Sequence, residues 1–302
     1  MNDSAPALSV SGLVQRFGHT MALDGLTFSV MPNQVVGLLG RNGAGKSTLL
    51  RIVSGQLRQS EGTAELFGLP VFNRAAALGE LCMIGDTPDF GKLKNIGELF
   101  FVCEGLFPHW NKPYAARLVE RFELPMAKKL KGFSRGMQTA LLLSVGLASG
   151  ATLTVFDEPS LGLDAVMRER FYDLLLEERH SQSGRTFLLS THLIDEVART
   201  LDSAVLIDAG KLLCEGSLAE LTSLYLSVSG APDAVRAITD RFVTLKEEEV
   251  AGSLVRHLRL NEAADAARLR ADASVQCAPM SLQRLFVFLT EEKGAARDAA
   301  TA

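Results

Sequence analysis

The first 55 residues contain short apolar runs separated by turn residues, a pattern typical of β-strands. Residues 26–30 alternate between apolar and polar side chains, which predicts a half-buried antiparallel sheet together with residues 8–10 and 22–23. Residues 35–39 are continuously apolar, as expected of a strand that is buried on both faces. A glycine-rich segment follows directly, and helix signals begin at Ser47.

Helical spacing replaces this pattern between residues 90 and 148, where apolar side chains recur every three or four positions. Strand-like runs then return, with helical stretches between them. The predicted strands are 153–156, 186–190 and 204–207, and the predicted helices are 165–180 and 193–200. Alternating strands and helices predict an α/β sheet.

One stretch without charge, between Arg135 and Asp157, has about the length of a membrane span. Serine and threonine interrupt it, and Ser149-Gly150 divides it into a helix-sized and a strand-sized piece. A buried helix that leads into a buried parallel strand therefore explains the stretch better than a transmembrane helix.

The amino-acid composition changes near Thr222, after which alanine and charged residues become more frequent. The pattern predicts a small α+β domain over 223–302, with the element order βαββαβα, after a first domain over 1–222 that has a helical subdomain at about 88–150. Ser281 is a candidate cap for the last helix, which carries Leu282, Leu285, Phe286 and Leu289 on one face. That apolar face is either ordinary core or a dimer or regulatory contact.

Composition and charge exclude some classes of protein and partner, but they do not indicate a function. The 302 residues are 47% hydrophobic and 22% charged, which is ordinary for a globular protein, and the net charge of −4 gives no reason to expect nucleic acid as the main partner. The four cysteines are too far apart for a zinc or redox motif, so we expect reduced thiols. The start of the chain lacks the pattern of a signal peptide.

Candidate chemistry begins with residues 40–47, Gly-Arg-Asn-Gly-Ala-Gly-Lys-Ser, which match the phosphate-binding loop G-x-x-x-x-G-K-[ST] between a strand and a helix. Glycines allow backbone N–H groups to converge on phosphate oxygens. We expect Lys46 to contact the β- and γ-phosphates and Ser47 to bind Mg²⁺. The full set of predicted nucleotide contacts in this loop is Gly40, Arg41, Asn42, Gly43, Ala44, Gly45, Lys46, Ser47 and Thr48.

A second element ends the predicted strand at 153–156 with Asp157 and Glu158. Ligands bind at the carboxyl ends of strands in open α/β sheets. Asp157 is therefore a candidate for holding Mg²⁺ through water, and Glu158 for accepting a proton from the attacking water.

Together with the segments that follow, these residues resemble the ATPase subunit of ABC transporters over about residues 8–220. Residues 133–138, Phe-Ser-Arg-Gly-Met-Gln, stand where that family has its signature motif, and residues 161–164, Leu-Gly-Leu-Asp, match its D-loop. His192 matches its switch histidine, and Phe17 stands where an aromatic side chain stacks on adenine. The resemblance implies a P-loop fold with a mixed core sheet, an antiparallel β subdomain and a helical subdomain.

The sequence departs from the family pattern in three segments: the signature, the Q-loop and the position of the adenine-stacking aromatic residue. In the signature, Arg135 and Met137 replace Gly and Gln, whereas Ser134 and Gly136, which in the family contact the nucleotide of the other subunit, are kept. Asp86 stands where the Q-loop glutamine is expected and could reach Mg²⁺ through water, although it could also be only a loop acid. Phe17 replaces the commoner tyrosine.

By this resemblance the chain is an ATPase with ATP and Mg²⁺ as cofactors, acting as a homodimer or with a related subunit, and Asp164 of the D-loop joins the nucleotide contacts. It would lie at the cytoplasmic face of the membrane and dock on a multi-spanning permease through Asp86 and residues 90–107. The resemblance favours export over import as the direction of transport. The departures resemble a bacterial subgroup that exports drugs or antimicrobial peptides. The alternatives are a soluble ABC ATPase acting on nucleic acid or ribosomes, and a nucleotide sensor without turnover.

Overall fold

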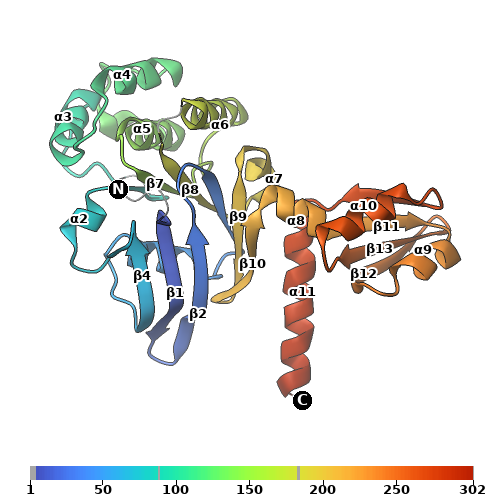
Figure 1. The fold of residues 1–302 in the computed structure, drawn as a ribbon. Coiled ribbons are helices and arrows are strands. Elements are labelled where there is room, and N and C mark those ends of the chain that lie inside the picture. The colour runs from blue at the N-terminus through green and yellow to red at the C-terminus, as the bar shows by residue number, and fades with distance from the viewer. Residues whose placement is uncertain (1–4, 88, 182–183, 302) are drawn as a thin grey trace. The chain divides into compact units, whose positions relative to one another are not determined.

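The computed structural model describes residues 5–87, 89–181 and 184–301, with the side chains of 292–301 left out. It divides into two compact units (Figure 1). The first contains Met1–Leu193 and Arg199–Leu212, and the second contains Ile194–Ala198 and Leu213–Ala302. The division after Leu212 lies before the boundary predicted at 222–223.

A six-stranded sheet with the order β10-β9-β3-β8-β7-β6 forms the centre of the first unit. Neighbouring strands from β9 to β6 are parallel, and β3, β7 and β8 are buried at every position, which explains their apolar runs. The predicted strands are thereby confirmed. The bounds are β3 (Val35–Leu39), β6 (Leu81–Ile84), β7 (Leu153–Asp157), β8 (Thr186–Thr191), β9 (Ser203–Asp208) and β10 (Lys211–Ser217).

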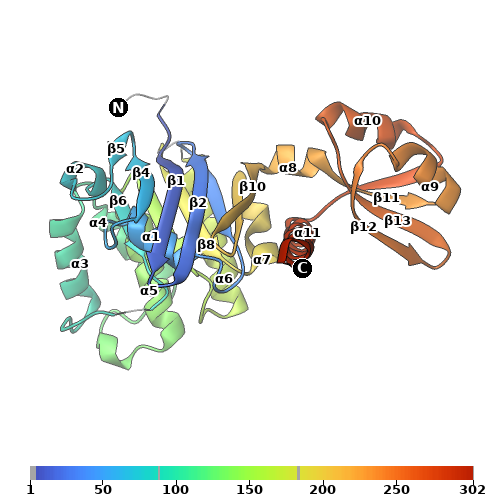
Figure 2. The same ribbon diagram turned by 90° about the horizontal axis from the view of Figure 1, so that it is seen from below.

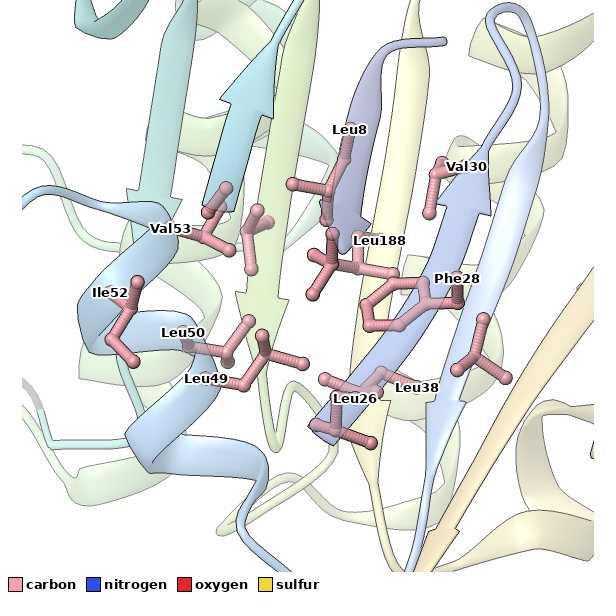
Figure 3. Close-up of a cluster of buried hydrophobic side chains, with 14 of the residues drawn as sticks. Leu8, Leu26, Phe28, Val30, Leu38, Leu49, Leu50, Ile52, Val53 and Leu188 are labelled. Atoms are coloured by element: carbon pink, nitrogen blue, oxygen red, sulfur yellow. The ribbon is translucent and has the colours of Figure 1, made fainter. Parts of the chain in front are cut away.

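A second, antiparallel sheet has the order β2-β1-β4-β5, with β1 (Leu8–Phe17), β2 (Thr20–Val30), β4 (Glu61–Leu66) and β5 (Leu69–Pro70). Helix α1 (Lys46–Val53) shares one hydrophobic core with both sheets. In Figure 3, Leu49 and Leu50 of α1 lie near Phe28 of β2 and Leu38 of β3. This core fixes the start of α1, and with it the glycine-rich loop, against the central sheet.

Helices make up most of residues 96–180: α3 (Ile96–Leu106), α4 (Lys112–Arg121), α5 (Arg135–Ala148) and α6 (Ala165–His180), with the short 3₁₀ helix η1 (Leu130–Gly132). Figure 2 shows α3 and α4 at the edge of the first unit. The side chains of Asn95, Asn111 and Ser134 cap the N-termini of α3, α4 and α5 by accepting backbone N–H bonds. Short helices also occur at α2 (Ala75–Leu78), α7 (Ile194–Val197) and η2 (Ala198–Thr200).

The charge-free stretch forms α5 and β7, as the sequence predicts. Within the described residues, every helix is too short or too polar to span a lipid bilayer. Cys82, Cys103, Cys214 and Cys277 are all free, and the first two are buried.

The second unit contains an antiparallel sheet with the order β12-β13-β11-β14. Its elements after α8 follow the predicted order from residue 225 onward, whereas α8 itself, begun by a capping box of Ser217 and Glu220, was not predicted. The bounds are α8 (Leu218–Leu224), β11 (Tyr225–Gly230), α9 (Pro232–Thr239), β12 (Val243–Val250), β13 (Ser253–Arg259), α10 (Ala263–Ala271), β14 (Val275–Pro279) and α11 (Leu282–Thr301).

The two faces of this sheet are covered differently. Leu254 and Leu258 of β13 join a core with residues of α9 and α10. His257 lies between them in sequence, and its ring centre is 4.7 Å from that of Phe288 of α11. The apolar face of α11 is at most 5% exposed at Leu282, Leu285, Phe286 and Leu289, which favours the interpretation as core.

Candidate functional site

The glycine-rich loop joins β3 to α1 in a conformation that depends on its glycines. Gly43 and Gly45 have positive φ angles of 81° and 104°. A Cβ added at Gly45 would lie 2.8 Å from the carbonyl oxygen of Ala22, so a side chain does not fit there. The loop therefore packs closely against β2, and its backbone is held at the N-terminus of α1, where N–H groups and the helix dipole favour an anion.

A cavity of about 360 Å³ opens at this loop. Its walls come from the loop, from the start of β2, and from acids at or just after the carboxyl ends of β6 and β7: Thr20, Met21, Ala22, Arg41, Asn42, Gly43, Gly45, Lys46, Ser47, Thr48, Asp86, Asp157 and Glu158. Gly40 and Ala44 belong to the predicted set but lie behind the wall, where Ala44 is buried and the carbonyl of Gly40 accepts a hydrogen bond from Lys46.

Lys46 is 6% exposed and has its ammonium group among oxygen atoms. Its Nζ lies 2.7 Å from the carbonyl oxygen of Gly40 and 3.6 Å from Oε1 of Glu158. Burial lowers the pKa of the Lys46 ammonium, and the charges of Glu158 and Asp157 oppose that shift. The side chain is thus a buried cation that faces the cavity.

Asp157 ends β7 and is also buried, and Ser190 of the adjacent β8 donates a 2.7 Å hydrogen bond to its Oδ1. Burial raises the pKa of the Asp157 carboxyl and the bond from Ser190 lowers it, while the charges of Asp86 and Glu158 raise it further. A nearby cation would reverse this balance and stabilise the charged carboxylate.

Glu158 has a positive φ of 49°, a conformation that is uncommon outside glycine, and its backbone N–H bonds to the carbonyl of Ser190 at 2.7 Å. Two neighbours hold its carboxylate: Thr191 Oγ1 donates to Oε2 at 2.9 Å, and Nδ1 of His192 lies 2.9 Å from Oε1. The structure therefore brings Lys46, Asp157, Glu158 and His192 together. Thr191 is a contact that sequence reasoning missed, although it stands between two residues of the recognised strand end.

Asp86 follows β6 and lines the same cavity from an exposed loop, where Thr87 donates to its Oδ1 at 3.1 Å. Among the described residues no group of three or more His, Cys, Asp or Glu side chains is close enough to hold a metal ion by itself. Mg²⁺ is usually bound by one or two carboxylates together with substrate phosphates, so the oxygen donors Ser47 and Asp157 fit that ion.

Phe17 ends β1 opposite Thr20 and is 46% exposed. The cavity wall is formed by Thr20, Met21 and Ala22 rather than by Phe17. Sequence reasoning missed these three residues. No local sequence pattern marks these residues as part of the site. They reach the cavity only in the folded chain, where Ala22 lies close to Gly45 and brings the start of β2 to the loop.

The signature and D-loop residues lie together, but they are not part of this cavity wall. Ser134 caps α5 and Asp164 caps α6. A Cβ at Gly136 would lie 2.8 Å from the carbonyl oxygen of Gly162, and the stem of Arg135 packs on Gly162. The side chain at 135 is thus accommodated by the D-loop.

A glycine-rich loop with the phosphate-binding pattern, a buried cation and a carboxylate held beside a histidine are the features of a nucleotide-hydrolysing P-loop protein. Residues 23–161 match the family model described as ABC transporter. The chain is 34% identical over 235 residues to the Nod factor export ATP-binding protein I of Ralstonia nicotianae, covering 72% of this chain and 69% of the relative. The Paraburkholderia xenovorans protein of the same name is 31% identical over 94% of this chain and 97% of its own length.

A third relative is the daunorubicin/doxorubicin resistance ATP-binding protein DrrA of Streptomyces peucetius, 33% identical over 72% of this chain and 67% of its own length. A solved structure of an ATP-binding subunit of an ABC transporter shares the fold, with a TM-score of 0.65 at 24% identity over 71% of this chain and 91% of that one. The chain belongs to the ABC transporter family and is an ATP-binding, ATP-hydrolysing subunit.

Proposed function

We propose that ATP is hydrolysed at the cavity between the glycine-rich loop and Glu158, with Lys46, Glu158 and His192 as the catalytic residues. The observation that carries this proposal is the position of Glu158, whose Oε1 lies 2.9 Å from His192 Nδ1 and 3.6 Å from Lys46 Nζ at the cavity wall. A binding-only site has no need of a carboxylate held in this way.

In this proposal the loop N–H groups and Lys46 bind the phosphates, and Lys46 offsets the charge that develops on the γ-phosphate. Glu158 accepts the proton of the attacking water, while Thr191 and His192 keep its carboxylate in one orientation. Ser47, Asp157 and, from its loop, Asp86 would hold Mg²⁺, which neutralises phosphate charge when bound. Phe17 remains the proposed partner of the adenine ring, beside Met21.

Replacement of the buried cation tests the site as a whole. Lys46→Ala should abolish ATP binding or phosphate release, because no other cationic side chain is as deeply buried at this cavity wall. Arg51→Ala, a change of the same charge on the exposed end of α1, is the matched control and should leave both unchanged. Phosphate release by Lys46→Ala at the unmodified rate would contradict the proposal.

Ser134, Gly136 and Asp164 are proposed to act on the nucleotide of a second subunit. Two features support this: they lie together at the starts of α5 and α6, and they are outside the cavity wall of their own chain. ATP would then close a dimer, and hydrolysis would open it.

Mixing two inactive variants tests that arrangement. A dimer of one Lys46→Ala chain and one Ser134→Arg chain contains one site with both defects and one intact site. Partial recovery of phosphate release is expected in the mixture. If mixed dimers form, as shown by two affinity tags, and no activity returns, the sites are not shared between subunits.

The proposed partner is a multi-spanning permease, which would hold the chain at the cytoplasmic face of the membrane and which the chain would drive in the direction of export. Relatives named for Nod factor export and for daunorubicin resistance support this direction. The proposed docking region, Asp86 with residues 90–107, includes Phe101 and Leu106, which are 77% and 67% exposed. Apolar side chains exposed to this extent on one helix are typical of a surface that is covered by a partner.

A further inference from the structure

Arg135 places a cation in the signature segment, at a position where the family pattern has glycine. It is the first residue of α5 and directly follows Ser134, whose hydroxyl caps the helix. The side chain is exposed, and within the described part of the chain its guanidinium has no hydrogen bond or ion pair. Its charge is therefore available to a group from outside this chain.

The stem of Arg135 is held in place, whereas its charged end is free. A Cβ added at Gly162 of the D-loop would lie 3.1 Å from Cγ and 3.3 Å from Cδ of Arg135, so the stem fills the space that a side chain at 162 would need. Gly162 has a φ of 86°, which favours glycine. Because the stem is already packed, less conformational entropy is lost when the guanidinium binds an anion.

The start of α5 and the D-loop form one surface. Thr139 Oγ1 of α5 donates to the carbonyl of Leu161 at 3.3 Å, and a Cβ at Gly136 would lie 2.8 Å from the carbonyl oxygen of Gly162. Leu161, and Val166 just after the D-loop, are 37% and 66% exposed. Large apolar side chains exposed beside a free cation are typical of a surface that a partner covers, and in the proposed function that partner is a second copy of the chain.

The groups beside Arg135 are suited to a phosphate. Ser134 Oγ accepts the backbone N–H of Met137 at 3.3 Å, so its own hydroxyl proton can be donated to a ligand. The first turn of α5 carries no acidic side chain to offset the guanidinium. A cation at the N-terminus of a helix is in an unfavourable position unless an anion is bound there, because the helix dipole has the same sign.

This phosphate would not come from the nucleotide of the same chain. Ser134, Arg135 and Gly136 are all absent from the wall of the cavity at the glycine-rich loop. In the proposed dimer, the nucleotide that meets the start of α5 belongs to the second copy. A guanidinium is planar and always charged, and it binds two phosphate oxygens at once, which suits a γ-phosphate on which charge develops during hydrolysis.

We propose that Arg135 is a further catalytic residue and that it acts in trans. Its guanidinium donates hydrogen bonds to γ-phosphate oxygens of the ATP bound by the second copy, and offsets the charge that develops there when water attacks. The inference rests on the proposed function, because it requires sites shared between two chains. It adds a full positive charge, which the family pattern lacks at this position, to the contacts of Ser134 and Gly136.

Arg135→Met tests the charge without removing the stem, because methionine keeps an unbranched apolar side chain on Gly162. The kcat of phosphate release should fall at least about tenfold, while the KM for ATP and the unfolding temperature stay close to those of the unmodified chain. Arg135→Lys keeps the charge and should lose less activity. Arg51→Met, the same change on exposed residue 51 of α1, is the control and should release phosphate normally.

Two mixed dimers of equal composition test the action in trans, each isolated by two affinity tags. In the first, one chain carries Lys46→Ala and the other carries Arg135→Met, which leaves one shared site intact. In the second, one chain carries both changes and the other carries none, which leaves neither shared site intact. The first dimer should therefore release phosphate faster than the second, whereas an arginine that acts within its own chain gives the opposite order.

An unchanged kcat in Arg135→Met, or the opposite order of the two mixed dimers, would overturn the inference. A loss of activity accompanied by an equal loss in Arg135→Lys and a lower unfolding temperature would also overturn it, since the role of the side chain would then be structural. Absent phosphate release by the unmodified chain, or no recovery when Lys46→Ala is mixed with Ser134→Arg, refutes the proposed function instead. Recovery in that mixture together with normal turnover by Arg135→Met refutes this inference alone.

Discussion

The two ends of β7 and β8 both bury charged side chains, but they use them in opposite ways. At the carboxyl ends, Asp157 is 8% exposed beside Lys46, at 6%. At the amino ends, Arg185 immediately precedes β8 and is 7% exposed. The comparison distinguishes Arg185, whose charge stabilises the fold, from Asp157 and Lys46, whose charges face the cavity.

Arg185 has its partners within the chain. Its guanidinium donates to the carbonyls of Gly146, Leu147 and Ala151 at 3.0, 2.6 and 3.0 Å, and to Glu178 at 3.1 Å. It thereby closes the C-terminal end of α5 over the start of the strands, where helix carbonyls lack intrahelical donors. A buried charge with this many fixed partners contributes to folding and leaves nothing to bind a ligand.

At the other end, the charged groups have partners on one side and the cavity on the other. Lys46 bonds to the backbone of its own loop, and Glu158 is held by Thr191 and His192, but all of them lie at or beside a cavity of about 360 Å³. The difference teaches that burial alone does not mark a functional charge. What marks it is burial together with open space on one side.

The largest effect is expected from removing the structural charge. Arg185→Met should lower the free energy of unfolding of the first unit by about 3–5 kcal/mol, because Glu178 and three carbonyls lose their buried donor. Urea denaturation followed through Trp110 measures it. Arg179→Met, which breaks a partly exposed pair with Asp202, is the control and should cost about 1 kcal/mol or less. Equal losses in the two variants would erase the contrast between the two ends.

A smaller loss of stability, but a larger loss of binding, is expected at the nucleotide end. Gly45→Ala puts a Cβ 2.8 Å from the carbonyl of Ala22 at a φ of 104°, so the loop must move. We expect about 2 kcal/mol of destabilisation, within the usual range for backbone strain, and at least tenfold weaker ATP binding by isothermal titration calorimetry.

Gly68→Ala is the matched control for strain without crowding. Gly68 has a φ of 77° but open space around its added Cβ. Its replacement should cost about 1 kcal/mol and leave ATP binding unchanged. Were both variants to bind ATP normally, close packing of the loop against β2 would not be what shapes the site.

A third buried titratable group, His257 of the second unit, is expected to make the stability of that unit depend on pH. His257 is fully buried; Ser227 Oγ lies 2.8 Å from Nδ1, and Nε2 has no hydrogen-bond partner among the described residues. Burial lowers the pKa of His257 from 6.5; Arg284 and Lys246 lower it further, while Glu248 opposes them.

The direction of the effect follows from that shift. The folded unit keeps His257 neutral, whereas the unfolded chain takes up a proton below about pH 6.5. The stability of the second unit should therefore be complete above that pH and fall as the pH decreases from 6.5 to 5. Hydrogen exchange of peptides from β13 measures it, and His257→Asn should remove the dependence. If the second unit of His257→Asn loses the same stability at low pH, another titratable group is responsible for the pH dependence.

Much of the site could be predicted from sequence because its signals are local. The glycine loop, Asp157, Glu158 and His192 are each recognised by residues within a few positions, and strand ends in an α/β sheet gather at one edge. Arg185 and Met21 could not be found in this way. Arg185 is one arginine among many until the fold brings the carbonyls of α5 to it, and Met21 reaches the cavity only because β2 packs on Gly45.

The fold shows the same division. The apolar runs of β3, β7 and β8 are buried on both faces and were predicted, whereas α8 begins with the local capping box of Ser217 and Glu220 and was overlooked. The apolar face of α11 left two interpretations open in the sequence, because a stripe of four side chains looks the same whether the chain or a partner covers it.

The most direct test of the account is phosphate release by Glu158→Gln, measured beside its ATP binding and its thermal unfolding. Because the amide cannot accept the proton of the attacking water, turnover should fall by on the order of 10² or more, while ATP binding and the unfolding temperature stay close to those of the unmodified chain. Glu177→Gln, an exposed acid on α6 paired with Arg121, is the control and should hydrolyse ATP normally. Hydrolysis by Glu158→Gln at the unmodified rate would contradict the role given to Glu158 and, with it, the distinction between the two ends of the sheet.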